Sequence, residues 1–321
     1  MNRLLLSTLV ALSLAACFAG RSVTVQTESN NGGGGGNGGN GGGGGGSSSS
    51  SGGGGSGQPD VIFGPSGATT LLVDNEWADA PQTGTPSYTF FSTMLGNAGV
   101  AFDTFINPDS GPDGMPTAVQ MNAYDTVIWF SGAAYGSATP SLSANQETQL
   151  TNWLDQGGKA LLLYTVNLVY DRGVGTWSGP ETDALLANYL GVVGDAADLT
   201  SDVNGGLDDS TYVVTGAPGQ LFAADKWTVA SDNPIDDYAD GVNVSAGTDI
   251  LATVQADPDG AGSDILNVPA VIGRKNVGAK GSSIVVYAGI TAEDLEAGLI
   301  GVASPQTFVN GTLTYVGFVG L

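Results

Sequence analysis

Short apolar runs alternate with helix-length segments along most of the chain. Runs of strand length occupy residues 69–74, 100–106, 124–130, 159–164 and 283–289. Segments with apolar positions at helical spacing predict helices over residues 86–98, 143–156, 180–190 and 305–319. Ser143 and Gln146 have the spacing of a capping box at the start of one of them. This order of strands and helices predicts an α/β fold in which helices cover both faces of a parallel sheet.

Residues 192–268 have a different pattern. They are rich in Asp, Gly, Thr and Val, and their apolar positions come in short runs such as TYVV and KWTV. Short β-branched runs between turn formers are typical of strands with loops between them. We therefore expect a β-rich insertion in the α/β body.

The amino terminus reads MNR, then LLLSTLVALSLAA, then Cys17. A positive end, a short apolar run and small residues are typical of a bacterial secretory signal. The run is shorter than the ~20 residues that a membrane span needs. Leu14-Ala15-Ala16-Cys17 resembles the lipobox of bacterial lipoproteins. The alternative is an ordinary signal peptide with an incidental cysteine.

The lipobox resemblance implies a signal peptide over residues 1–16 and a mature chain that begins at Cys17. Its sulfur would carry diacylglycerol and its amine a fatty acid such as palmitate, so the membrane would be a partner through lipid. Phe18 follows the cysteine, where lipoproteins retained in the inner membrane of enteric bacteria have Asp. The resemblance therefore implies a cell-envelope location, in the outer membrane for a Gram-negative source.

Residues 17–58 would join this anchor to the body at 59–321. From residue 27 to residue 58 the chain contains no apolar side chain and is mostly Gly, Ser and Asn. Nothing there offsets the entropy of ordering the backbone, so we expect a disordered tether. Gly-rich scaling gives a reach of roughly 35 Å over about 40 residues. A neutral low-complexity insertion is the alternative interpretation.

Charge and composition exclude several classes of function. The chain has 8 Lys and Arg, 31 Asp and Glu, and no His, for a net charge of −23. Nucleic acid is excluded as a partner, because its binding is driven by cationic side chains. Cys17 is the only cysteine, which excludes intramolecular disulfides and Cys-ligated metal sites in the body.

Four stretches carry a further resemblance: LLVDN, YDTVIWFSG, LDQGGKALLLYT and SIVVYAGI. In this order they resemble the class I glutamine-amidotransferase-like domain of secreted bacterial proteins, over residues 68–190 and 268–321. The resemblance implies a flavodoxin-like, three-layer αβα fold. Active members have a Cys after a strand, activated by a His-Glu pair. Here Thr165, Val166 and Asn167 follow the matching strand. We therefore expect no amidotransferase activity and a chain that is not an enzyme.

Ligands of open α/β sheets bind beyond the carboxyl ends of the strands. The candidate ligand-binding residues at these ends are Asp74, Asn75, Glu76, Trp77, Ser131, Gly132, Thr165, Asn167 and Asp171. Thr291 and Glu293 follow the last strand at the same edge.

Three of these carboxylates, those of Asp74, Glu76 and Asp171, admit several roles. They could serve as acid and base, or bind a cation or a sugar hydroxyl. Otherwise Asp74 caps a turn and Glu76 is solvated. Trp77 either stacks on a sugar or packs in the protein.

An Asp-rich segment, ADPDGAGSD, suggests calcium as a cofactor. Asp257, Asp259 and Asp264 could supply the oxygen ligands that hard cations prefer. Counted from Asp257, the position of the bidentate Glu in an EF-hand loop holds Val268. A solvated turn explains the same residues, since Asp, Gly and Pro all form turns.

Together these features predict a lipid-anchored, surface-displayed, non-catalytic binding protein of the cell envelope, with a glycan or an envelope protein as its partner. The alternative is a carboxylate-dependent hydrolase that acts on extracellular polysaccharide. A structural envelope component without a small ligand is a third interpretation.

Overall fold

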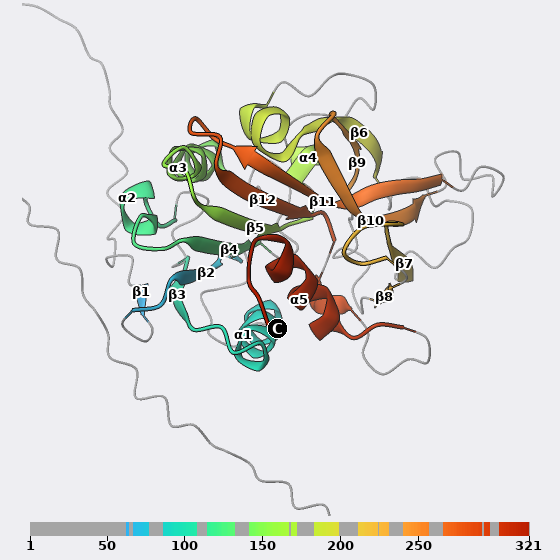
Figure 1. Ribbon diagram of the computed structural model, residues 1–321, viewed down its shortest axis with the longest axis horizontal. Coiled ribbons are helices and arrows are strands. Elements are labelled where there is room, and N and C mark those ends of the chain that lie inside the picture. The colour runs from blue at the N-terminus through green and yellow to red at the C-terminus, as the bar shows by residue number, and fades with distance from the viewer. Residues whose placement is uncertain are drawn as a thin grey trace, which may run out of the picture.

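A ten-stranded sheet forms the centre of the molecule (Figure 1). The computed structural model describes residues 62–63, 67–76, 86–107, 114–131, 141–166, 168–171, 183–198, 211–223, 225–230, 240–256, 266–290, 292–295 and 302–320. The strands follow in the order β1 (Ile62–Phe63), β3 (Phe102–Ile106), β2 (Thr70–Asp74), β4 (Thr126–Phe130), β5 (Ala160–Tyr164), β12 (Ser283–Ala288), β11 (Leu266–Val277), β10 (Thr248–Ala256), β7 (Thr211–Gly216) and β8 (Lys226–Ala230).

The sheet has a parallel half and an antiparallel half. Strands β3, β2, β4, β5 and β12 pair in parallel, in the register that brings Leu72 opposite Ile128 and Ile128 opposite Leu162. From β12 onward the strands pair antiparallel through β11, β10, β7 and β8. Strand β12 joins the two halves, with a parallel neighbour on one side and an antiparallel one on the other.

The β-rich character predicted for residues 192–268 is confirmed in their described part, but its arrangement differs from a separate insertion. Strands β7, β8 and β10 continue the main sheet. Of the described strands in this region, only β6 (Val192–Asp198) and β9 (Asp240–Val244) pair apart from it. The predicted parallel sheet is present over β3, β2, β4, β5 and β12. The strands of the β-rich region extend it as antiparallel neighbours, because they return directly instead of crossing over through helices.

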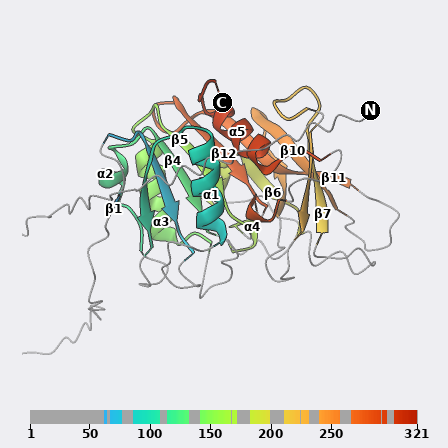
Figure 2. The ribbon, with the colours of Figure 1, turned by 90° about the horizontal axis from the view of Figure 1, so that it is seen from below.

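Helices lie on both faces of the sheet. On one face lie α1 (Pro86–Asn97) and α5 (Pro305–Tyr315), which Figure 2 shows side by side. On the other lie α3 (Ala144–Leu154) and η2 (Leu185–Leu190), with the short helices α2 (Ala118–Met121) and α4 (Leu168–Asp171). The helix expected over residues 180–190 is a π-helix in its described part, and the last helix ends at Tyr315, four residues earlier than predicted.

Two hydrophobic cores follow from the alternation of side chains along the strands. Leu72 packs with Phe91 and Phe308 in the core under α1 and α5. Leu71 and Val73, whose side chains point to the opposite face, belong to the core under α3 and η2. Strands buried on both faces have no polar side, which explains why they read as continuous apolar runs in the sequence.

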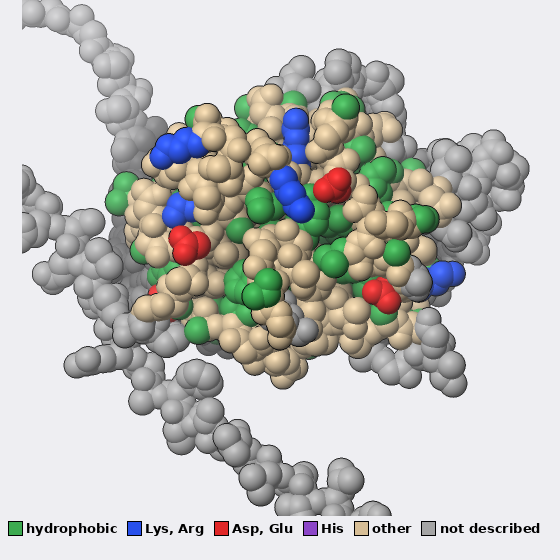
Figure 3. Space-filling model, viewed as in Figure 1, with side chains coloured by type: hydrophobic (Ala, Val, Ile, Leu, Met, Phe, Trp, Pro, Cys, Tyr) green, Lys and Arg blue, Asp and Glu red, His purple; other side chains and the backbone are tan. Residues whose placement is uncertain are grey.

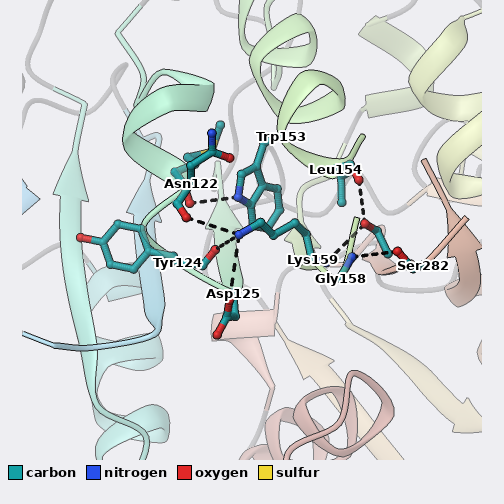
Figure 4. A network of polar contacts seen from close by, with 10 residues as sticks. Asn122, Tyr124, Asp125, Trp153, Leu154, Gly158, Lys159 and Ser282 are labelled. Carbon is teal, nitrogen blue, oxygen red and sulfur yellow. Dashed lines mark hydrogen bonds and ion pairs between the residues drawn. The ribbon is translucent and has the colours of Figure 1, made fainter. Parts of the chain in front are cut away.

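A polar network fixes the edge of the sheet where β4, β5 and β12 begin (Figure 4). Lys159 Nζ donates to the carbonyl oxygens of Tyr124 at 2.7 Å and Asn122 at 3.4 Å, and lies 4.0 Å from Asp125. Ser283 Oγ donates to the Leu154 carbonyl at 2.7 Å and so holds β12 to the end of α3. These contacts are structural and stand at the amino ends of the strands.

The two outermost strands are short or covered. Strand β1 has two residues. At the other end, Val229 of β8 forms a bridge with Leu295, and the Ala303 N–H donates to the Lys226 carbonyl at 2.7 Å. No helix within the described ranges is both long and apolar enough to cross a membrane.

Candidate functional site

The strand order reverses at β2, which has β3 on one side and β4 on the other. In open α/β sheets, such a switch point opens a crevice at the carboxyl ends of the strands, where ligands bind. Backbone hydrogen bonds continue the sheet past these ends: the N–H of Asn75 donates to Phe130, and that of Asn107 donates to Asp74, both at 2.9 Å. The residues that follow β2 are therefore held rigidly at the switch point.

Asp74, the last residue of β2, has a buried carboxylate with a 2% exposed fraction. Its Oδ1 accepts the Glu76 N–H at 3.1 Å, as in the turn-capping alternative for this residue. Its Oδ2 has no hydrogen-bond partner among the described residues. Burial raises the pKa of Asp74 to about 6; the Glu76 N–H opposes this shift, and the Glu293 carboxylate adds to it.

Glu76 and Glu293 meet at one hydroxyl. Ser87, in the first turn of α1, donates to Glu76 Oε1 and lies 2.7 Å from Glu293 Oε1. Glu293 belongs to η3 (Ala292–Asp294), which follows β12. Glu76 is only 9% exposed, so the interpretation of Glu76 as a solvated residue was wrong. We call Asp74, Glu76, Ser87 and Glu293 the carboxylate cluster.

The side chain of Asn75 is hydrogen-bonded within the protein and does not face a ligand. Its Oδ1 accepts hydrogen bonds from Gln146 at 2.7 Å and Asn107 at 3.0 Å, and its Nδ2 donates to the Ser141 carbonyl at 3.2 Å. The capping box predicted from Ser143 and Gln146 is present. Asn75 thus ties the end of β2 to the end of β3 and to the start of α3, and it is fully buried.

Ser131 and Thr165 also pair with each other. Ser131 Oγ donates to Thr165 Oγ1 at 2.5 Å, and Thr165 Oγ1 donates to the Val166 carbonyl at 3.1 Å. Both residues are buried at the ends of β4 and β5. They therefore join adjacent strand ends within the protein.

Several candidate residues lie outside the described residues: Cys17, Trp77, Gly132, Asn167, Asp257, Asp259 and Asp264. Of Asp171, only the backbone is described, as the end of α4. Thr291 also lies outside, whereas Glu293 belongs to the cluster. Within the described part of the chain, no group of three or more His, Cys, Asp or Glu is placed to hold a metal ion.

Two residues of this edge were missed by the sequence analysis. Ser87 sits in a helix, where its spacing predicts only an exposed or capping hydroxyl. Asp240 comes from β9 and is buried; its Oδ2 accepts the Tyr287 hydroxyl at 2.5 Å and the Val169 N–H at 3.2 Å. No local pattern marks either residue, because each meets its partner only through the tertiary fold.

The opposite edge of the sheet contains a cavity of about 300 Å³. It is lined by residues 67–70, 98–101 and 318–320 and contains none of the candidate residues. On the face seen in Figure 3, Lys and Arg side chains are scattered and form no continuous basic patch among the described residues.

Comparisons with known proteins do not assign this chain to a family. No protein-family model matches the chain, and no curated protein matches it. Solved structures resemble it at low identity. The structure titled "mmIFT52 N-terminal domain" has 12% identity and a TM-score of 0.46 over 78% of this chain and 100% of its own. A glutamine amidotransferase has 10% identity and a TM-score of 0.40, over 78% of this chain and 100% of its own. The exo-beta-1,4-mannosidase Op5Man5 from Opitutaceae bacterium strain TAV5 has 13% identity and a TM-score of 0.40. The match covers 70% of this chain and 31% of the mannosidase chain. At this level, none of the three assigns a function.

Proposed function

We propose that this chain is a non-catalytic binding protein of the cell envelope, displayed on a tether and held to the membrane by lipid on Cys17. The LAAC sequence and the Gly- and Ser-rich segment before residue 59 support the anchor and the tether. We further infer a flavodoxin-like arrangement for the parallel half. Its strand order, β3-β2-β4-β5-β12, corresponds to the order 2-1-3-4-5 of that fold.

The observation that carries the binding proposal is the carboxylate cluster at the switch point. Three acidic side chains from two distant segments, 74–76 and 293, gather at the carboxyl edge next to the start of α1. The second oxygen of Asp74 is buried and lacks a donor among the described residues. A ligand that presents a hydrogen-bond donor, as an amine or a sugar hydroxyl does, would complete this carboxylate.

The experiment compares ligand binding by the full-length wild type in detergent with that of Asp74→Asn. Calorimetry with spermidine and with a panel of oligosaccharides probes the two classes of donor. We expect at least tenfold weaker binding for the variant, because an amide cannot supply a second free acceptor. Asp125→Asn is the control, since that side chain is 74% exposed at the opposite edge. Equal affinities in Asp74→Asn and wild type, or no binding by either, would contradict the proposal.

The anchor is tested separately. Cells that express wild type or Cys17→Ser are labelled with an alkyne fatty acid and fractionated. We expect label and membrane association in the wild type and neither in the variant. An unlabelled wild type, or a variant that stays with the membrane, would refute lipid attachment.

The polysaccharide hydrolase remains a second candidate for one reason. Glu76 and Glu293 contact the same hydroxyl oxygen, so their nearest carboxylate oxygens lie within roughly 5–6 Å of each other. Retaining glycosidases use carboxyl groups about 5–5.5 Å apart. However, Ser87 occupies the space between them, where a glycosidic bond would have to lie. Hydrolysis of a polysaccharide by the wild type and its loss in Glu76→Gln would favour this candidate over binding alone.

A further inference from the structure

Cationic side chains are too few in this chain to neutralise its carboxylates. The sequence has 8 Lys and Arg against 31 Asp and Glu. Even if each cation paired with a different carboxylate, 23 carboxylates would have no cationic partner. Between two described residues, the only ion pair joins Lys159 to Asp125, at 4.0 Å on an aspartate that is 74% exposed. An exposed pair of this kind contributes little to stability.

Two of the other described cations bind neutral groups. Arg274 Nη1 donates to the carbonyl oxygens of Ala187 at 3.1 Å and Asn188 at 3.2 Å, near the end of η2. Lys275 Nζ lies 4.5 Å from the centre of the Tyr315 ring. Carbonyl oxygens and an aromatic ring carry no net charge, so these contacts do not neutralise carboxylates.

Tyrosine hydroxyls, which are neutral, hold four aspartates in the described part of the chain. Tyr189 of η2 donates to Asp155, which follows α3, at 2.8 Å. Burial and the Asp155 carboxylate raise the pKa of Tyr189 to about 12, so its hydroxyl keeps the donated hydrogen at neutral pH. The other pairs, which join residues 21 to 66 positions apart, are Tyr124–Asp103 at 2.8 Å, Tyr287–Asp240 at 2.5 Å and Tyr315–Asp249 at 2.8 Å.

Tyr315 shows how closely such a pair is built into the fold. It ends α5, and its hydroxyl reaches Asp249 of β10. Asp249 pairs in register with Gly273 of β11, where a Cβ would lie 2.5 Å from the tyrosine ring. The ring therefore lies against the backbone of one strand while its hydroxyl binds the carboxylate of the neighbouring strand. One tyrosine joins a helix to two strands without using a charge of its own.

We infer that this protein is built for a saline medium: tyrosine–aspartate hydrogen bonds take the place of ion pairs between its elements, and dissolved salt raises its stability. Salt screens attraction and repulsion between charges alike. A fold with few ion pairs has little attraction to lose, whereas a net charge of −23 has much repulsion to lose. A neutral hydroxyl has no net charge to screen, so the tyrosine contacts persist. This inference does not depend on the proposed function.

Urea unfolding at several salt concentrations tests the salt effect. Full-length protein in a non-ionic detergent, with a chelator in every buffer, is unfolded at neutral pH in about 0.02 M to about 0.5 M NaCl, a range over which the Debye length falls severalfold. We expect the unfolding constant at a fixed urea concentration to fall about tenfold or more over this range. A constant that stays the same or rises with salt would overturn the inference.

Tetramethylammonium chloride separates screening from binding of a particular cation. This bulky cation screens charge at the same ionic strength, but it cannot enter a site made of oxygen ligands for a small metal ion. We expect the two chlorides to stabilise the protein equally. Stabilisation by NaCl alone would show that sodium is bound at a site, and screening would then be the wrong explanation.

Tyrosine variants test the role of the hydroxyls. Tyr189→Phe and Tyr315→Phe each remove one donor to an aspartate, so both should be less stable than the wild type by a factor that is the same at every salt concentration. Tyr164→Phe is the matched control, because its hydroxyl lies 2.6 Å from that of Thr312 and neither group is charged. If the losses in Tyr189→Phe and Tyr315→Phe disappear in about 0.5 M NaCl while the loss in Tyr164→Phe remains, the tyrosine contacts are screened like ion pairs and the inference is wrong.

Discussion

Gln146 donates its Nε2 hydrogen to Asn75 Oδ1 at 2.7 Å, a contact between residues 71 positions apart in the sequence. The same Gln146 side chain closes the capping box of α3. One residue therefore both starts a helix and fixes the end of β2. The switch point of the sheet is held by side-chain amides, which do not change charge with pH, and the carboxylate cluster is built next to this framework.

Asn75→Ala should be strongly destabilising. The substitution removes the acceptor of Gln146 and Asn107 and the donor to Ser141, all in a fully buried site. Buried groups left without partners cost about 1–3 kcal/mol each, so we expect a loss of roughly 2–4 kcal/mol in the free energy of unfolding. Urea denaturation measures it. Asn122→Ala, at an exposed side chain, serves as control, and equal losses in both variants would contradict the role of Asn75.

Asp74→Asn should raise stability at neutral pH. The folded state binds the Asp74 proton more tightly than the unfolded chain, because burial raises the pKa from 3.8 to about 6. Its contribution is therefore fully present below pH 3.8 and is lost as the pH rises through 6. This shift corresponds to about 3 kcal/mol at most. The asparagine keeps the acceptor for the Glu76 N–H and carries no charge.

The measurement is the free energy of unfolding of wild type and Asp74→Asn at pH 4, 5, 6 and 7. The variant should gain stability relative to wild type across this window. A constant difference between the two proteins at all four pH values would rule out the titration of Asp74 as the cause.

Lys159→Met tests the amino edge of the sheet. Methionine keeps the apolar stem but leaves the Tyr124 carbonyl without its 2.7 Å donor. We expect a loss of about 1–2 kcal/mol in thermal or urea unfolding. Lys275→Met is the comparison, because its Nζ lies 4.5 Å from the Tyr315 ring centre on an exposed residue and should contribute at most about 0.5–1 kcal/mol. A larger loss for Lys275→Met than for Lys159→Met would show that the network of Figure 4 is not important for stability.

Gly311→Ala should disrupt the packing of α5. A Cβ at this position would lie 1.9 Å from Phe222 Cε1, in a core where Phe222 stacks on Phe308. Overpacking of this kind costs about 1–3 kcal/mol. Gly96→Ala in α1 meets no atom within 4 Å and should instead stabilise by about 0.5–1 kcal/mol. Melting temperatures that move in the same direction for both variants would contradict this account.

The parallel half of the fold could be predicted because its signals are local. The predicted strands at 69–74, 124–130 and 159–164 match β2, β4 and β5 to within two residues at each end, and the helix expected over 86–98 matches α1. Doubly buried strands give continuous apolar runs, and those runs fix element type without tertiary information.

The antiparallel half and the chemistry of the site could not be predicted in the same way. Whether β7 and β10 extend the main sheet or form their own depends on pairings such as Val254 with Val214 and with Val268, which no local pattern encodes. Glu293 was placed at the correct edge, but its meeting with Ser87 joins residues 206 positions apart. Sequence patterns locate strand ends, whereas the neighbour of each polar group depends on packing.

The two outer strands of the ten-stranded sheet, β1 and β8, determine how readily a second copy of the protein could pair with the sheet. An exposed outer strand offers unpaired N–H and C=O groups that recruit other chains into intermolecular β-structure. Here one outer strand is too short to act as a template, and the backbone of the other already bonds to Leu295 and Ala303. Among the described strands of this sheet, neither outer strand therefore offers a long unpaired edge on which a second copy could extend it.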